Sequence, residues 1–170
     1  MLVGCGIPAG LLMAWQVKRY SGDGKIQTCS QWFGAGYQVD FAPFDASHSF
    51  IASYRVSALP QVLGRDPMIY LKFDLDRFFE NPDAIKSGTT GFFQIDLLNS
   101  SGQVVQTASL HTATTIWWGG GKSWGMYDLD KSRFHFDRNE NYVLRVSYNP
   151  GGVPPPAKQL YFNIDNCAYK

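Results

Sequence analysis

Apolar and polar residues alternate along most of the chain between positions 37 and 164. In residues 69–75, for example, the odd positions are all apolar, and a lysine and an aspartate stand among the even ones. Successive side chains of a strand point to opposite faces, so this period of two predicts strands with one buried and one wet face. Such strands are typical of antiparallel sheets. The same pattern marks residues 37–41, 50–56, 93–97, 142–148 and 160–164.

Turn-forming residues separate the predicted strands. Residues 99–102 (NSSG) lie between two β-rich runs and indicate a hairpin, and residues 137–141 (DRNEN) precede a further strand. Helical candidates are limited to residues 76–80 and part of residues 9–18. We therefore predict an all-β fold, an antiparallel β-sandwich of about eight or nine strands with at most one or two short helices. A β-barrel is the alternative.

The length of the chain and its charge limit the number of domains and the kinds of partner that we expect. With 170 residues, 45% of them hydrophobic, the chain can fill one core. We predict a single sandwich domain over residues 21–170, preceded by a tether segment over residues 1–20. The Pro- and Gly-rich run at 149–156 joins two predicted strands and indicates a long loop. The net charge is +1 and the basic residues are scattered, which disfavours a nucleic-acid partner.

Residues 2–5 (LVGC) place three small or apolar residues before a cysteine. This is the pattern of a lipobox, at which bacterial signal peptidases cut and a diacylglycerol is attached, here to Cys5. A secretory signal usually carries an apolar stretch of about 7–15 residues before the cleavage site, and only residues 1–4 precede this cysteine. The alternative is a buried or frayed terminal segment over residues 1–17. A spanning helix needs about 20 apolar residues, and Pro8 interrupts this stretch.

The three cysteines are an odd count. If Cys5 carries a lipid, Cys29 and Cys167 remain as a pair near the two ends of the domain, and we predict a disulfide between them. Disulfides persist in oxidising compartments such as the bacterial periplasm. The alternative is two free thiols in a cytoplasmic protein.

Residues 2–5 resemble the processing site of bacterial lipoproteins, and the β-rich remainder resembles small β-sandwiches of the cell envelope. These classes include immunity lipoproteins that neutralise toxins in the periplasm, lipoproteins that anchor secretion machines, and sugar-binding modules. The resemblance implies a periplasmic protein, lipid-anchored to the bacterial membrane through Cys5, that binds a macromolecule. It implies a protein partner such as a toxin, with a glycan as the alternative, and neither a catalytic residue nor a cofactor.

Residues 121–125 (GKSWG) match two catalytic or nucleotide-binding motifs in part. They fit G-x-S-x-G around Ser123, for which His135 and Asp137 offer triad partners, and they fit the end of a phosphate loop. Both motifs require a helix directly after the loop, and the following residues show no helical period. A serine hydrolase therefore remains only as a disfavoured alternative, and nucleotide binding is not expected.

Metal ligands with a recognisable spacing are absent from the sequence, because His48, His111 and His135 are far apart along the chain. Acidic pairs at positions 74/76 and 128/130 offer hard oxygen ligands for Ca²⁺. Solvated acids on the polar face of a strand are the simpler interpretation. We predict no metal site.

Tryptophan and glycine concentrate in residues 116–127 (IWWGGGKSWGMY). Tryptophan and tyrosine are common at binding hot spots, and exposed tryptophans need a partner to cover them, so we predict a contact loop here. The alternative is that one of the two adjacent tryptophans belongs to the core, since neighbouring residues of a strand face opposite ways. The predicted partner-binding residues are Trp117, Trp118, Lys122, Ser123, Trp124 and Tyr127.

In its most specific form, the prediction is an immunity-type inhibitor that occludes the active site of a toxin. Trp118 and Trp124 are expected to anchor the loop in the partner's cleft, and Lys122 is expected to pair with carboxylates there. A carbohydrate-binding module would instead stack the same tryptophans on sugar rings.

Overall fold

The computed structural model describes residues 13, 16–31, 34–45, 47–62, 66–75, 91–111, 116–120, 123–127, 133–150 and 157–167. For residues 30–31, 34–35, 73–75, 116–120, 123–127, 157–158 and 160 it describes the path of the backbone only.

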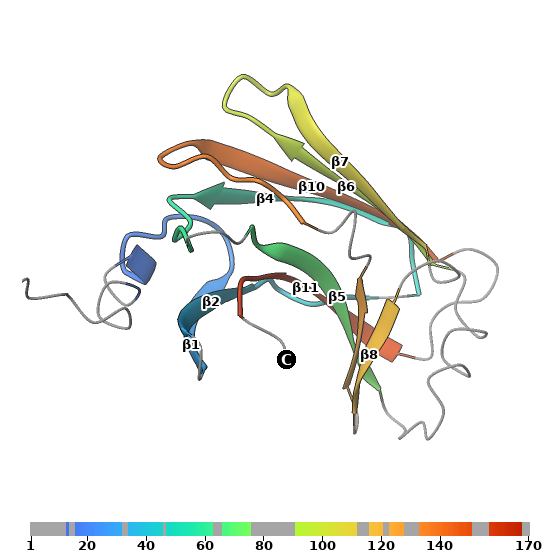
Figure 1. The fold of residues 1–170 in the computed structure, drawn as a ribbon. Coiled ribbons are helices and arrows are strands. Elements are labelled where there is room, and N and C mark those ends of the chain that lie inside the picture. Colours follow the sequence, from blue (N-terminus) through green and yellow to red (C-terminus); the bar gives the residue numbers. More distant parts are fainter. Residues whose placement is uncertain are drawn as a thin grey trace, which may run out of the picture.

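The described residues form eleven strands in two sheets that pack face to face (Figure 1). The strands are β1 (Lys25–Gln31), β2 (Gly34–Asp40), β3 (Phe44–Asp45), β4 (Phe50–Ser57), β5 (Met68–Leu75), β6 (Phe92–Leu98), β7 (Val104–His111), β8 (Ile116–Gly120), β9 (Ser123–Tyr127), β10 (Asn141–Asn149) and β11 (Ala157–Asp165). Sheet A has the order β1-β2-β11-β5-β9-β8, with β3 beside β11, and sheet B has the order β4-β10-β6-β7. All these strand pairs are antiparallel, so the predicted antiparallel β-sandwich is confirmed.

The strands bury alternate residues, as the sequence pattern predicts. In β10 the four even-numbered positions are buried and the odd-numbered positions are exposed or half-buried. In β6 the side chains of Phe93, Ile95 and Leu97 are fully buried. Burying one large apolar side chain contributes about 1.5–3 kcal/mol. A slip of one residue would turn each such set to solvent, so the alternation itself fixes the register of the strands.

Aromatic rings join the two sheets across the core. Tyr54 of β4 stacks on Phe162 of β11, with ring centroids 5.7 Å apart, and also contacts Phe41, which follows β2, at 4.5 Å. Within sheet B, Phe93 stacks on Tyr148 at 4.4 Å. Such ring pairs add about 0.5–1.5 kcal/mol each beyond the burial of their area. The core therefore depends on aromatic contacts between strands that are far apart in the sequence.

Residues 133–136, which precede β10, close one side of the sandwich, and we call them the closing segment. Arg133 forms an isolated bridge with Met68 at the start of β5, and Phe134 beside it is fully buried. The side chain of Gln106, on β7, continues this pairing. Its Nε2 donates to the carbonyl of Arg133 at 2.6 Å, and its Oε1 accepts from the backbone N–H of His135 at 3.1 Å. The side-chain amide of Gln106 thus makes two hydrogen bonds to the backbone that a neighbouring strand would otherwise make.

The N-terminal part of the described chain packs on the same core. Met13, Gln16 and Val17 have helical conformation, in agreement with the helix predicted within residues 9–18. Met13 is buried, so the core includes a residue of the predicted tether segment. The helix predicted at residues 76–80 lies outside the described residues. Among the described residues, no helix is long and apolar enough to cross a membrane.

Both predicted turns are present. The backbone N–H of Asn99 donates to the carbonyl of Gln103 at 2.9 Å and closes the hairpin between β6 and β7. Gly102 has a φ of 76° there, in the left-handed region where glycine carries no steric penalty. In the turn before β10, Asn139 has a φ of 67°. Asparagine tolerates this conformation better than most residues, which explains its place in the turn.

The segment rich in tryptophan and glycine differs from the prediction. Instead of a loop, its backbone forms β8 and β9, which extend sheet A beyond β5. Its tryptophan, isoleucine, methionine and tyrosine residues suit a pleated surface, and the glycines of β8 are tolerated because β8 is an edge strand of the sheet. These two strands and the two-residue β3 account for a strand number above the expected eight or nine.

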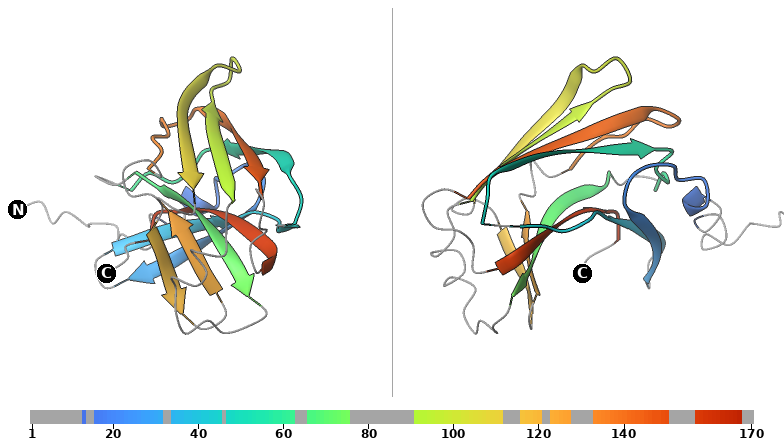
Figure 2. Two further views of the ribbon diagram at one scale, coloured as in Figure 1. Left: turned by 90° about the vertical axis from the view of Figure 1, so that its right-hand side faces the viewer. Right: turned by 180° about the vertical axis from the view of Figure 1, so that it is seen from behind.

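Sheet A is arched, and this shape gives the molecule two distinct ends. The pair β1–β2 and the hairpin β8–β9 both bend away from sheet B (Figures 1 and 2). Residues 16–24, drawn in blue, lie at one end of the sandwich, and the hairpin β8–β9 lies at the other (Figure 2). The start of the described chain and the tryptophan-rich hairpin are therefore far apart.

Candidate binding site

Backbone pairing assigns each tryptophan of the hairpin β8–β9 to a row across sheet A. Trp117 lies opposite Met126, and Met126 lies opposite Leu71. Leu71 is fully buried, so this row belongs to the face that packs toward sheet B. Trp124 lies opposite Phe73, two positions along β5, and its row belongs to the same face.

The row between these two belongs to the outer face of sheet A. Trp118 lies opposite Gly125, and Gly125 lies opposite Lys72, whose side chain is exposed. Lys72 in turn lies opposite the half-buried Tyr161 of β11. Because glycine has no side chain, the row consists of an aromatic residue, a cation, a bare backbone position and a second aromatic residue. We call Tyr161, Lys72, Gly125 and Trp118 the outer row.

The other predicted contact residues are spread along the hairpin. Ser123 lies opposite Asp74, and Tyr127 lies opposite Ile116 at the other end of the hairpin. Lys122 lies outside the described residues. The predicted set is therefore not one continuous patch, because its backbone positions alternate between the two faces of sheet A.

Ser123 and His135 lie at opposite ends of β5. Ser123 pairs with Asp74, whereas Arg133, two residues before the histidine, bridges Met68. Six residues of strand, at about 3.3 Å each, separate these two points by about 20 Å. A general base must lie within hydrogen-bond reach of its nucleophile. The geometry thus provides no serine triad from Ser123, His135 and an aspartate.

His135 has a structural role instead. Its Nδ1 lies 3.0 Å from Asp66 Oδ1, and its Nε2 lies 3.4 Å from Asp137 Oδ1. The hydrogen bond with Asp66 is the main reason that the pKa of His135 is raised, and the charge of Asp66 adds to it. The other oxygen of Asp137 accepts from the Tyr142 hydroxyl at 3.1 Å. This exposed cluster holds the closing segment against the start of β5.

Four large apolar side chains are exposed among the described residues of sheet B. Val104 and Val105 lie at the start of β7, whereas Ile51 and Phe92 lie at the starts of β4 and β6, the end of the sheet that lies toward the hairpin β8–β9 (Figure 1). Ile51 is 76% exposed and Phe92 is 41% exposed. They lie opposite Ser147 and Asn149 of β10, and together these residues line a shallow hollow of about 550 Å³. We call Ile51 and Phe92 the apolar pair. Alternation alone did not mark them, because they occupy polar-face positions of their strands.

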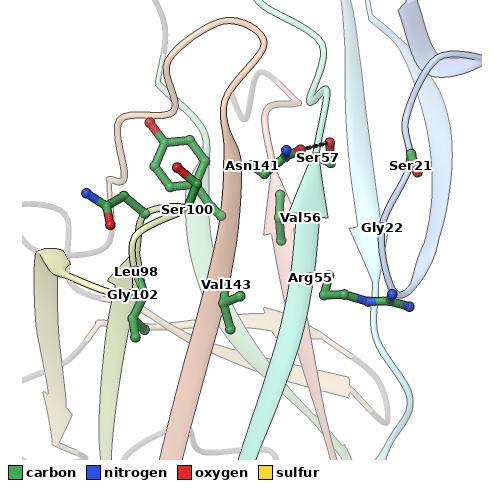
Figure 3. Close-up of a pocket in the computed structure, with 12 residues that line it drawn as sticks. Ser21, Gly22, Arg55, Val56, Ser57, Leu98, Ser100, Gly102, Asn141 and Val143 are labelled. Carbon is green, nitrogen blue, oxygen red and sulfur yellow. Dashed lines mark hydrogen bonds between the residues drawn. The ribbon is translucent and has the colours of Figure 1, made fainter.

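A groove of about 660 Å³, lined by both apolar and polar residues, lies at the opposite end of sheet B, where β4 ends and β10 begins (Figure 3). Its floor is the outer face of the sheet, on which Val143 lies between Arg55 and Leu98. Residues 21–22 form one wall, and the turn between β6 and β7, with Ser100, forms the other. We call this site the rim groove.

The wall at residues 21–22 runs beside β4, and the backbone of residues 21–23 hydrogen-bonds to the backbone of that strand. The N–H of Ser21 donates to the carbonyl of Ser57 at 3.1 Å, and the N–H of Asp23 donates to the carbonyl of Arg55 at 2.8 Å. A Cβ at Gly22 would lie 2.6 Å from the Arg55 carbonyl oxygen, so only glycine permits this approach. The N–H of Arg55 donates to Asp23 Oδ2 at 2.7 Å. The backbone of β4 beside the groove is therefore already paired.

Some side chains of the rim groove already form hydrogen bonds with other residues. The Ser57 hydroxyl donates to Asn141 Oδ1. Arg55 Nη2 donates to Asp23 Oδ1 at 3.1 Å, and the guanidinium remains 80% exposed. Backbone and side-chain hydrogen bonds from Arg55 lower the pKa of Asp23, so the pair is ionised and neutral in sum. The groove therefore offers amide, hydroxyl and guanidinium donors without a net charge.

The predicted disulfide is present. Cys29 and Cys167 are bonded, with their Cα atoms 6.1 Å apart, and they are 138 positions apart in the sequence. Cys29 lies opposite Gly36, where a Cβ would come within 2.6 Å of the Asn166 carbonyl oxygen. Glycine therefore allows the end of β11 to cross β2 and reach Cys29. Asp165 lies close to both sulfurs, but the bond consumes the thiolates that a metal ion would need.

The remaining predicted sites are separate or lie outside the described residues. His48 pairs with Asp45 at 3.3 Å, and His111 is an exposed residue at the end of β7. Neither joins His135 in a group that could hold a metal ion among the described residues. Cys5 and the rest of the lipobox at residues 2–5 lie outside the described residues, as do the side chains of the acidic pairs.

No model of a protein family matches the chain, and no curated protein matches it.

Proposed function

We propose that this chain is a non-enzymatic binding protein of the bacterial cell envelope that is lipid-anchored at Cys5 and recognises a partner protein with its hairpin end. In the most specific form of this proposal, it is an immunity-type inhibitor. The hairpin β8–β9 then covers or enters the active site of a toxin, and inhibition is steric.

The cysteines support a location in the bacterial cell envelope. Cys29 and Cys167 are bonded to each other, which leaves Cys5, the cysteine of the lipobox, outside that bond. Disulfides of this kind persist in secreted and periplasmic proteins. A lipid on Cys5 then accounts for the third cysteine.

The placement of the hairpin is the observation that carries the proposal. Residues 16–24, which lead from the predicted anchor into the sandwich, lie at one end of the molecule, and the hairpin β8–β9 lies at the other (Figures 1 and 2). A protein anchored at the first end therefore presents the hairpin away from the membrane. This is the end at which a soluble partner in the periplasm would approach.

Two features of that end fit a protein partner. The outer row combines Trp118 with the exposed Lys72, and aromatic and cationic residues are frequent among binding hot spots. The apolar pair, Ile51 and Phe92, is exposed at the same end of sheet B. The pair belongs to the outer face of sheet B and the outer row to the outer face of sheet A, so the two features lie on opposite sides of this end. Exposed apolar residues are typical of protein interaction sites. Trp118 is the central anchor in this proposal, because its row belongs to the outer face.

The test is a binding and inhibition assay with purified proteins encoded beside the gene of this chain. We expect one of them to bind, and we expect Trp118→Ala to weaken that binding by at least about tenfold, which is the loss of a hot-spot residue of about 1.4 kcal/mol. Trp117→Phe is the matched control, because its row belongs to the face toward sheet B and the variant keeps an aromatic side chain there. Equal affinity of the Trp118→Ala variant and the unmodified protein would overturn the proposal for the hairpin.

A further inference from the structure

We infer that the rim groove is a second binding site, and that its ligand is a neutral saccharide. The site is independent of the partner-binding hairpin proposed above, because the groove lies at the other end of sheet B (Figures 1 and 3). Its volume of about 660 Å³ falls within the range of small-molecule sites, about 300–1,000 Å³.

The groove combines an apolar floor with polar walls. Val143 and Leu98 are half-buried side chains that lie side by side on the floor. Sugar rings present C–H groups on their faces and hydroxyls around their edges. The floor can therefore contact the ring face, while the polar walls meet the hydroxyls. This division between an apolar base and a few oriented polar groups is typical of ligand pockets.

The donors of the groove match hydroxyl groups. Asn141 accepts from Ser57 through Oδ1, which leaves its Nδ2 amide with two N–H donors at the groove. Arg55 uses Nη2 for Asp23, and its exposed guanidinium retains further donors. Ser100 adds an exposed hydroxyl on the opposite wall. Three kinds of polar group thus approach one ligand from two sides.

Charge and backbone pairing argue against two other ligands. An anion would gain little, because the positive charge of Arg55 is balanced by Asp23 at 3.1 Å. An extended peptide would need free backbone groups on β4, and residues 21–23 already pair with the backbone of Arg55 and Ser57. Recognition must therefore use side chains, and the side chains present are neutral in sum.

The test is an NMR titration of the whole isotope-labelled protein with chitotriose and with cellotriose, each at millimolar concentration. We expect at least one of them to shift the backbone amide signals of Arg55, Ser100 and Asn141, and to leave the signals of β8 and β9 unchanged. An acidic trisaccharide, trigalacturonic acid, is expected to bind at least about fivefold more weakly, because the groove has no unbalanced cation.

Two variants make the test specific. Asn141→Asp keeps the acceptor for Ser57 and removes the amide donors. We therefore expect the affinity for the neutral trisaccharide to fall by about tenfold, or the signal shifts to disappear. Trp118→Ala, which is expected to weaken partner binding by the hairpin, is expected to leave the titration unchanged. The inference is overturned if neither neutral trisaccharide shifts the groove signals, if only the acidic one does, or if Asn141→Asp binds as the unmodified protein does.

Discussion

Asp96 illustrates how single residues on the outer face of sheet B are held in place. Its side chain is only 8% exposed although it occupies a polar-face position of β6. Burial alone raises the pKa of this carboxyl, but hydrogen bonds from Thr107, Arg145 and Gln94 outweigh it and lower the pKa. The Thr107 hydroxyl donates at 2.7 Å and Arg145 Nη2 at 2.8 Å. A buried charge is tolerated there because it is fully hydrogen-bonded.

His135 provides a pH-dependent contribution to stability. Its pKa is raised in the folded protein, chiefly by the hydrogen bond with Asp66, so the folded state holds the proton more tightly than the unfolded chain. The stabilisation is therefore complete below about pH 6.5 and is lost as the pH rises through the pKa of the folded state. Both side chains are largely exposed, so we expect less than about 1 kcal/mol.

The measurement is the melting temperature of the protein and of its His135→Gln variant across this pH range. We expect the variant to be less stable at pH 5 to 6 and the two curves to converge at alkaline pH. A constant difference between them at every pH would show that the charge of His135 contributes nothing.

Some single residues were predictable from the sequence and others were not. The pair Cys29 and Cys167 followed from the count of cysteines, and this prediction is confirmed. The partners of His135 were only partly visible, because Asp66 is 69 positions away in the sequence and reaches it only through the bridge between the closing segment and β5. Such contacts depend on the tertiary fold, which a local pattern does not contain.

At the scale of elements, the side chain of Gln106 links the closing segment before β10 to sheet B. Gln106 makes two hydrogen bonds to the backbone of this segment, at Arg133 and His135. We expect Gln106→Ala to lower the free energy of unfolding by about 1–2 kcal/mol, since each of the two bonds contributes about 0.5–1.5 kcal/mol. Hydrogen exchange of the His135 amide should accelerate in the variant.

Ser109→Ala is the matched control for this prediction. Ser109 lies on the same strand, β7, with an exposed side chain, and substitutions at such positions usually change stability by less than about 0.5 kcal/mol. If Gln106→Ala were as stable as this control, the two hydrogen bonds of Gln106 would contribute nothing measurable to stability.

The period-two pattern predicted the strands well and failed at one pair of elements. The six predicted alternating segments all lie in or beside observed strands, because burial of one face decides each of them. The strands β8 and β9 were expected as a loop, since glycines at positions 119–121 interrupt the pattern. Pairing of β9 with β5 overrides that local signal, because the edge of a sheet stabilises a strand that its own sequence would not form.

At the scale of the whole molecule, the disulfide joins the first strand to the end of the last. The bond between Cys29 and Cys167 spans 138 positions. In the chain-entropy model, such a crosslink stabilises a protein by about 4–5 kcal/mol, because it restricts the unfolded chain. We expect the double variant Cys29→Ser/Cys167→Ser to lose an amount of this order in urea unfolding.

Reduction of the unmodified protein provides the control. With a reductant present, its unfolding midpoint should fall to that of the double variant. An unfolding midpoint that is the same with and without reductant would mean that the bond does not restrict the unfolded chain or does not form.

The overall architecture of two antiparallel sheets was predictable, whereas the two ends of the molecule were not. Alternation specifies which face of a strand is buried but not which strands become neighbours. The rim groove consists of residues from β4, β6, β10, the turn between β6 and β7, and residues 21–22, and the apolar pair comes from β4 and β6. Both surfaces arise from the strand order, which only the structure supplies.

The backbone register assigns Trp118 to the outer row and Trp117 to the neighbouring row, whose face of sheet A packs toward sheet B. The most direct test is NMR of the indole N–H signals, assigned with Trp→Phe variants, in the presence of a soluble paramagnetic gadolinium complex. We predict strong broadening of the Trp118 signal and protection of the Trp117 signal. A protected Trp118 beside a broadened Trp117 would contradict the account, because the residue proposed as the anchor would then be unavailable to any partner.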